Sequence, residues 1–166
     1  MAEAAEHDHN HGSGCSHVTQ QAERAGQAMA DAETACRARG VRLTPIRRRV
    51  LEALYATHKP LGAYDLAELL GPKGRRLAPI TVYRALDFLM EQGLVHRLAS
   101  RNAYVACPKA HEGGEAVAFL ICETCGGVDE LTSPELSSTL QGLLGREGFA
   151  PNGKVLEITG HCSHCH

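Results

Sequence analysis

Two Cys-x-x-Cys pairs constrain the fold of this chain more than any other feature: Cys122 with Cys125, and Cys162 with Cys165 close to the C-terminus. Four thiolates in two closely spaced pairs form the ligand set of a tetrahedral zinc ion. Thioredoxin-type redox dithiols have the same spacing, but there the motif begins a helix in a βαβ unit. Here one pair is expected between two strands and the other at the chain end, which favours a structural zinc site.

The cysteine usage also indicates a compartment. The chain contains seven cysteines, and neither an apolar leader nor a run of about 18 apolar residues is found. An odd number of cysteines in paired spacing fits reduced, metal-binding thiols better than a secreted disulfide framework. We therefore expect a cytoplasmic protein with no membrane segment.

Charge is distributed unevenly along the chain, although the formal net charge is only −2. Residues 37–101 contain 13 Lys and Arg against 5 Asp and Glu, which sums to +8, and the segments on either side sum to −5 each. A basic segment between acidic flanks indicates a partner that is a polyanion. The alternative is a solvated surface with chance clustering.

Four helical patterns and two short apolar runs organise the first two thirds of the chain. Helices are expected over 18–39, from Thr44 with Pro45 at its first position, over 63–70 and over 79–92. The runs 94–98 and 103–107, separated by a polar turn, predict a β-hairpin. Helices followed by a hairpin predict a winged helix over 18–107, in which helix 79–92 enters the major groove of double-stranded DNA.

The last part of the chain predicts a second, smaller unit. Strands are expected over 117–121, 128–131 and 154–159, with a helix from Ser133-Pro134 to about residue 146. A β-β-α-β unit of about fifty residues has a thin core and needs the zinc ion as a staple. The fold class is therefore α+β, with a hinge over 108–114 and the zinc-stapled domain over 115–166. Residues 1–17 form a His-rich tail that is expected to be disordered.

Side chains of the basic segment are candidates for DNA contact. Arginine can read a guanine edge through two hydrogen bonds, and residues before the recognition helix can bind phosphates. The candidates are Tyr64, Arg75, Arg76, Thr81, Tyr83 and Arg84. A basic surface helix in a protein-interaction module is the competing interpretation.

The chain resembles the ferric uptake regulator family over roughly residues 20–165. The resemblance is carried by Arg42-Leu43-Thr44-Pro45-Ile46-Arg47, Ala63-Tyr64-Asp65-Leu66, the stretch from Thr81 to Leu89, Gly93-Leu94-Val95-His96 and the two cysteine pairs. The His-rich stretch that the family usually has before the first cysteine pair is replaced by residues 117–121. In this respect the chain is similar to the zinc-sensing branch of the family.

The resemblance implies a second, regulatory zinc ion at the hinge, so that about two zinc ions are expected per chain. Its implied ligands are His96, Cys107 and Glu130, with His111 as the preferred fourth ligand and Glu115 as the alternative. Imidazole is a better partner for zinc beside a thiolate than a carboxylate is. One His, one Cys, a second His and one Glu also form a mixed tetrahedral set that suits zinc on chemical grounds.

The resemblance further implies a homodimer whose C-terminal domain is the dimerisation domain. The expected function is a transcriptional repressor of zinc-uptake genes that binds palindromic operator DNA with zinc as co-repressor. Iron, manganese or peroxide sensing on the same scaffold, and a thiol redox switch, are the alternatives. A zinc hydrolase is disfavoured, because it would need an open metal position and a general base, whereas the hinge site uses its Glu as a ligand.

Overall fold

The computed structural model describes residues 16–108 and 114–165, with the side chains of α1 described from Ala25 onward. The helical part of the chain comprises α1 (Ser16–Ala38), α2 (Pro45–Tyr55), α3 (Ala63–Leu70) and α4 (Pro79–Glu91). A hairpin of β1 (Val95–Leu98) and β2 (Ala103–Ala106) follows. The remaining elements are β3 (Val117–Cys122), β4 (Val128–Thr132), α5 (Pro134–Arg146) and β5 (Val155–Gly160).

The predicted elements are present, and their bounds lie within two residues of those expected. The first helix begins at Ser16, so the last two residues of the expected tail are helical, and residues 1–15 lie outside the described part. Pro45 occupies the first turn of α2, although the Thr44 side chain makes no capping hydrogen bond. Ser133 does cap α5, because its hydroxyl accepts a hydrogen bond from the Leu136 N–H.

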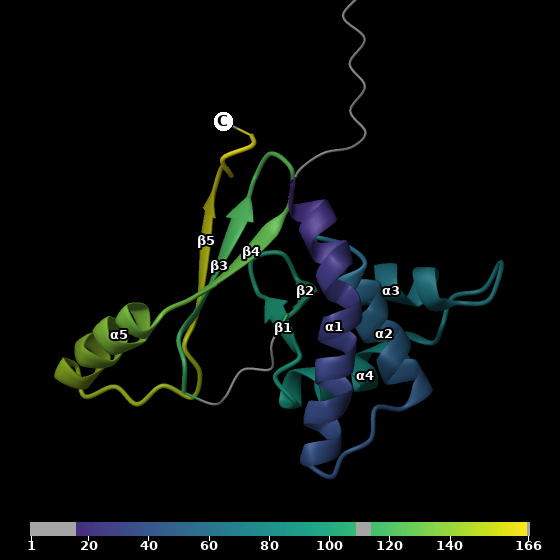
Figure 1. Cartoon of the computed structure of the whole chain (residues 1–166), viewed down its shortest axis with the longest axis horizontal. Helices are drawn as coiled ribbons and strands as arrows, with labels where there is room; N and C mark the ends of the chain where they lie inside the picture. Colours follow the sequence, from purple (N-terminus) through teal and green to yellow (C-terminus); the bar gives the residue numbers. More distant parts are fainter. Residues whose placement is uncertain (1–15, 109–113, 166) are drawn as a thin grey trace, which may run out of the picture.

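The structure has a helical winged-helix domain beside a small sheet (Figure 1). In the two-stranded sheet β1 pairs antiparallel with β2, and the three-stranded sheet has the order β4-β3-β5. Within it β3 is antiparallel to β4 and parallel to β5. The parallel pair requires the long crossover through β4 and α5, and α5 lies at the far side of this sheet from the winged helix (Figure 1).

The main core lies inside the winged-helix domain. Apolar residues from one face of each helix fill it, including Leu51, Leu66 and Leu86, which are fully buried. Cys36 on α1 is part of this core, as expected for a small buried hydrophobe. Burial of these faces fixes α4 against α2 and α3, so that the opposite side of α4 is presented to solvent.

A second, smaller core joins the hairpin to the three-stranded sheet. Leu98 from β1 is buried against Val117, Phe119 and Ile121 of β3. Because successive side chains of a strand alternate between faces, these three β3 residues define the inner face of the sheet, which contacts the hairpin. The C-terminal domain is therefore attached to the winged helix through β1 and β2.

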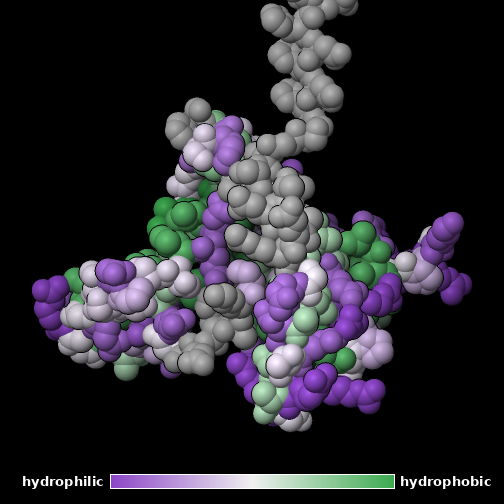
Figure 2. Space-filling model, in the orientation of Figure 1, coloured by the Kyte–Doolittle hydropathy of each residue, from purple (hydrophilic) through white to green (hydrophobic). Residues whose placement is uncertain are grey.

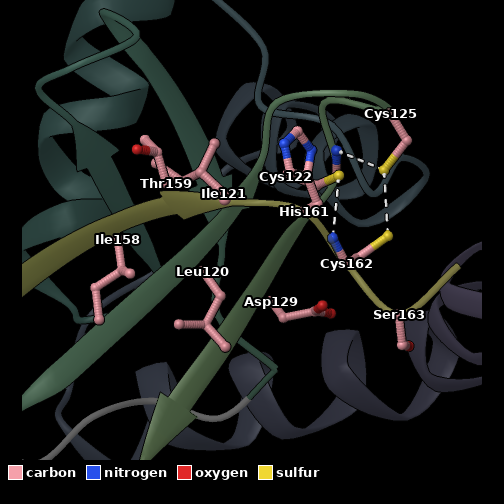
Figure 3. A pocket seen from close by; sticks show the side chains of 12 residues that line it. Leu120, Ile121, Cys122, Cys125, Asp129, Ile158, Thr159, His161, Cys162 and Ser163 are labelled. Atoms are coloured by element: carbon pink, nitrogen blue, oxygen red, sulfur yellow. Dashed lines mark hydrogen bonds between the residues drawn. The ribbon is translucent and has the colours of Figure 1, made fainter. Parts of the chain in front are cut away.

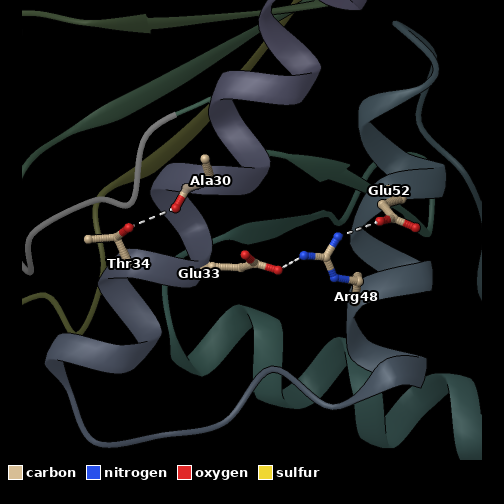
Figure 4. A network of polar contacts seen from close by, with 5 residues as sticks. All are labelled: Ala30, Glu33, Thr34, Arg48 and Glu52. Atoms are coloured by element: carbon tan, nitrogen blue, oxygen red, sulfur yellow. Dashed lines mark hydrogen bonds and ion pairs between the residues drawn. The ribbon is translucent and has the colours of Figure 1, made fainter.

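Polar contacts link α1 to α2 on the outside of the winged helix. Arg48 forms ion pairs with Glu33 of α1 and with Glu52 one turn along α2 (Figure 4). The Arg48 side chain is 44% exposed, so solvent screens both pairs and each contributes little to stability.

Candidate metal centres and nucleic-acid interface

The four cysteines of the two Cys-x-x-Cys pairs converge at one end of the three-stranded sheet. Their sulfur atoms all lie within 4.8 Å of one another, and Cys125 Sγ is 4.0 Å from Cys162 Sγ. Four sulfurs bound to one zinc ion at about 2.3 Å lie roughly 3.8 Å apart. The sulfur group therefore fits a tetrahedral zinc ion, and a dithiol redox motif does not require two pairs to meet.

Strand pairing brings the two cysteine pairs together. Cys122 is the last residue of β3, and its partner in the parallel register is Gly160, the last residue of β5. Cys162 follows two residues later, and its backbone N–H donates to Cys122 Sγ at 3.4 Å. Within the turn after β3, the Gly127 N–H donates to Cys125 Sγ at 3.4 Å.

The protonation of these thiols also indicates a cation site. Backbone N–H groups of Cys125 and Cys162 donate to the Cys122 sulfur and lower the pKa of its thiol to about 5. A hydrogen bond with the Cys162 side chain and burial raise the pKa of Cys165 above its ordinary value. Adjacent thiolates repel each other, so all four ionise together only when a cation shares their charge.

A surface cavity of about 340 Å³ lies beside the cysteine group. Figure 3 shows Leu120 and Ile158 on its floor, with the sulfurs of Cys122, Cys125 and Cys162 at its end. Leu120 and Ile158 are 37% and 50% exposed and belong to the outer face of the sheet, opposite the hairpin. The zinc site and an exposed apolar surface thus both belong to the three-stranded sheet.

Cys107 contacts two other predicted regulatory ligands, His96 and Glu130, where the hairpin meets the sheet. His96 Nδ1 is 2.7 Å from Cys107 Sγ, and the Cys107 thiol donates a hydrogen bond to the Glu130 carboxylate. His96 lies on β1, Cys107 directly follows β2 and Glu130 lies on β4. Imidazole, thiolate and carboxylate from two parts of the fold are a donor set that suits zinc.

Cys107 is held firmly within this group. It is fully buried, its N–H donates to the Leu94 carbonyl, and its own carbonyl accepts a 2.7 Å hydrogen bond from the Tyr55 hydroxyl. Burial, together with the negative charge of Glu130, raises the pKa of the Cys107 thiol well above its ordinary value. Zinc binding here therefore requires displacement of the thiol proton.

Phe119 packs against the imidazole of His96. The two ring centroids are 5.1 Å apart at a tilt of 58°, and Phe119 is opposite Glu130 in the β3–β4 register. Phe119 and Tyr55 were not predicted as site residues. Their roles depend on tertiary packing, and an apolar residue in a strand or a Tyr at a helix end gives no signal of it in the sequence.

Of the two candidates for the fourth regulatory ligand, the structure describes only Glu115. His111 lies outside the described residues, and Glu115, just after that segment, is exposed at the start of the C-terminal domain. The preference for His111 over Glu115 stays a prediction.

The predicted DNA-contacting residues lie on α3, on α4 and in the loop between them. Tyr64 on α3 is 60% exposed, Arg84 on α4 is exposed, and Thr81 and Tyr83 are half-buried. Arg75 and Arg76 lie in the exposed loop between α3 and α4, where Arg76 forms an ion pair with Glu68. Tyr64 and Tyr83 also line a cleft of about 490 Å³ with Lys59, Arg101 and Asn102, three residues that sequence analysis did not select.

This architecture of a winged helix, a zinc-binding cysteine group and a small α/β domain is that of a metal-dependent transcription regulator. The sequence pattern of the ferric uptake regulator family matches residues 38–159, and the chain belongs to this family. Its members are transcription regulators and not enzymes.

Three individual relatives each match 84% of this chain. The zinc uptake regulation protein of Escherichia coli strain K12 is 40% identical over 139 residues, which cover 84% of this chain and 81% of that protein. A zinc uptake regulator solved in complex with zinc and DNA is 38% identical with a TM-score of 0.77, and the match covers 84% of this chain and 93% of the other. The crystal structure of holo XcZur is 41% identical with a TM-score of 0.74, covering 84% and 96%.

Within the described residues, no helix combines the length and the apolar character needed to cross a bilayer.

Proposed function

We propose that this protein is a zinc-responsive transcriptional repressor that binds palindromic operator DNA as a homodimer and controls zinc-uptake genes. The observation that carries the proposal is the contact of Cys107 with both His96 of the hairpin and Glu130 of the sheet. Similarity to a zinc uptake regulator solved with zinc and DNA supports the choice of metal and of polyanion.

The two candidate zinc sites have different duties in this proposal. The four-cysteine site is permanent and stabilises the C-terminal domain, since metal binding contributes directly to the folding free energy of a small domain. The hinge site is exchangeable, with His111 preferred as the fourth ligand and Glu115 as the alternative. This gives about two zinc ions per chain.

Zinc at the hinge site supplies a bond between the winged helix (18–107) and the dimerisation domain (115–166). His96 and Cys107 belong to the hairpin that is continuous with α4, whereas Glu130 belongs to the sheet. Holding these side chains together fixes the angle between the reading helix and the sheet. A coupling of about 1–3 kcal/mol changes operator affinity by about 5–150-fold.

The outer face of the three-stranded sheet supports dimerisation. Leu120, Leu131 and Ile158 are exposed there, and α5 buries none of its residues within the chain. Figure 2 shows apolar surface over this sheet between α5 and the mostly hydrophilic winged helix. A second copy of the chain would cover this face and place two α4 helices about one turn of DNA apart.

The test uses a labelled palindromic duplex and two matched alanine variants of buried cysteines, Cys107→Ala and Cys36→Ala. Elemental analysis of dialysed protein should give about two zinc ions per chain for the parent and about one for Cys107→Ala. Zinc should strengthen operator binding by the parent about 5–150-fold and leave Cys107→Ala unaffected.

Cys36→Ala is the control, because Cys36 is equally buried but lies in the helical core away from Glu130. It should retain both zinc ions and the zinc dependence of operator binding. Equal operator affinity of the parent with zinc and with a chelator would contradict the sensing role. An iron or manganese requirement in the same titration would identify a different metal sensor.

A further inference from the structure

The turn of the hairpin is bound by a carboxylate from the C-terminal domain. Glu157 on β5 accepts hydrogen bonds from two consecutive backbone N–H groups, that of Ala99 at 2.6 Å and that of Ser100 at 3.0 Å. Burial raises the pKa of Glu157, but these hydrogen bonds and one from the Ser100 hydroxyl outweigh it and hold the pKa below its usual value. Hydrogen bonds to an ionised acceptor are about twice as strong as those between neutral groups.

Glu157 reaches the turn from the inner face of the sheet. It is opposite Phe119 in the β3–β5 register, so both side chains are on the face that contacts the hairpin. Leu98 of β1 is buried against the same face. The hairpin is thus attached to the sheet at both ends: at His96 and Cys107 by the candidate zinc site, and at its turn by Glu157.

The other side of the turn faces the cleft of the winged helix. Arg101 and Asn102 line this cleft together with Tyr64 and Tyr83. The turn has a defined shape, because the Arg97 guanidinium donates to the Asn102 side chain at 2.8 Å. A constraint on Ala99 and Ser100 therefore also acts on the next two residues of the turn, Arg101 and Asn102.

We propose that Glu157 is a positioning residue for DNA binding, which holds the hairpin turn on the dimerisation domain and so aligns Arg101 and Asn102 for the operator. The inference rests on the proposed function. Glu157 and the hinge zinc restrict the same motion, a tilt of the hairpin relative to the sheet. A hairpin that is held at both ends cannot tilt in this way. Loss of the Glu157 contact should weaken zinc and operator binding together, because coupling between sites is reciprocal.

The first experiment measures the contact without DNA. Glu157→Gln keeps the size of the side chain but replaces one acceptor oxygen with an amide donor that faces a backbone N–H. In zinc-loaded protein, hydrogen exchange of the Ala99 and Ser100 amides should be about tenfold faster in Glu157→Gln than in the parent. Glu147→Gln, an exposed glutamate that follows α5, is the matched control and should exchange as the parent does. Equal protection in all three proteins would overturn the proposal.

The second experiment separates positioning from a general structural role. With saturating zinc, Glu157→Gln should bind a palindromic duplex roughly tenfold more weakly than the parent. With chelator, the two proteins should bind alike. An equal loss in both conditions, or no loss, would overturn the proposal.

Failure of the proposed function gives a different result. In that case the parent and Glu147→Gln themselves show no zinc effect on the duplex. If they show the effect and Glu157→Gln shows it undiminished, the repressor proposal stands and the role of Glu157 falls.

Discussion

At the residue scale, several arginines of the basic segment make contacts within the chain. The Arg47 guanidinium lies 3.5 Å from the centre of the Phe88 ring, and Arg49 donates to the Leu70 carbonyl at 2.7 Å. Arg84 is exposed on the solvent side of α4. The charge of +8 over 37–101 therefore overstates the number of cations that are available to phosphates.

Replacement of Arg84 by Ala should weaken specific operator binding by about 1–3 kcal/mol, the cost of one bidentate base contact. The melting temperature should not change, because the side chain is exposed. Anisotropy titrations against the operator and against a duplex altered at single base pairs measure both affinity and preference. An unchanged base preference would remove Arg84 from base readout.

Arg49→Met should lower stability and leave operator affinity unchanged, the opposite of what is expected for Arg84→Ala. Methionine keeps the apolar stem but leaves the Leu70 carbonyl without its donor, which should lower the free energy of unfolding by about 1 kcal/mol. Operator affinity of the folded protein should be unchanged. Urea unfolding, monitored alongside the operator titration, distinguishes this result from a phosphate contact, which would lower affinity and the salt dependence of binding.

At the scale of elements, the sequence was sufficient for the order and type of every helix and strand described. Apolar spacing of three and four residues defined the helices, and Pro45, Pro79 and Ser133 marked where three of them begin. The pairing of β3 with β5 could not be predicted in register. It depends on the crossover through α5, which periodicity within a strand does not report.

The loop between α3 and α4 supplies a test of local structure. A Cβ on Gly71 would lie 1.9 Å from the Arg75 carbonyl oxygen, whereas a Cβ on Gly74 has no atom within 4 Å but sits at a φ of +78°. Gly74→Ala should cost about 1–2 kcal/mol of stability through the left-handed backbone alone. Gly71→Ala should cost more, since the loop that carries Arg75 must move.

Urea unfolding of both glycine variants measures these costs. Gly71→Ala should also weaken binding to any duplex, because Arg75 and Arg76 are displaced from their positions. Equal stabilities for the two variants would show that the loop adapts without strain.

For the whole molecule, the candidate sites were predicted to different extents. The four-cysteine site could be predicted from the spacing of Cys122, Cys125, Cys162 and Cys165, because the two cysteines of each pair are only three residues apart in the sequence. His96 and Glu130 lie on different strands, Cys107 lies just after a third, and all three were assigned through resemblance to a family. Glu157 and Tyr55 had no signal, since a carboxylate that binds backbone N–H groups across a domain contact looks like any surface residue in the sequence.

Dimerisation connects the C-terminal domain to DNA affinity. The core of this domain consists of only a few buried residues, one of which, Leu98, comes from the hairpin. In the proposed dimer, the apolar outer face would have two functions, to complete the packing of the sheet and to pair the reading helices. Loss of the partner should therefore halve the phosphate contacts as well as expose Leu120 and Ile158.

Ile158→Glu places a charge on this outer face and should convert the dimer into monomers, because a buried unpaired carboxylate opposes association. Leu69→Glu is the matched control, since Leu69 is 63% exposed but lies on α3 of the winged helix. Sedimentation equilibrium should give a monomer for the first variant and a dimer for the second. The slope of log affinity against log salt concentration should fall to about half in Ile158→Glu, in proportion to the phosphates contacted. A dimeric Ile158→Glu protein would place the interface elsewhere, and a monomer with the parent's salt slope would show that one chain makes all the phosphate contacts.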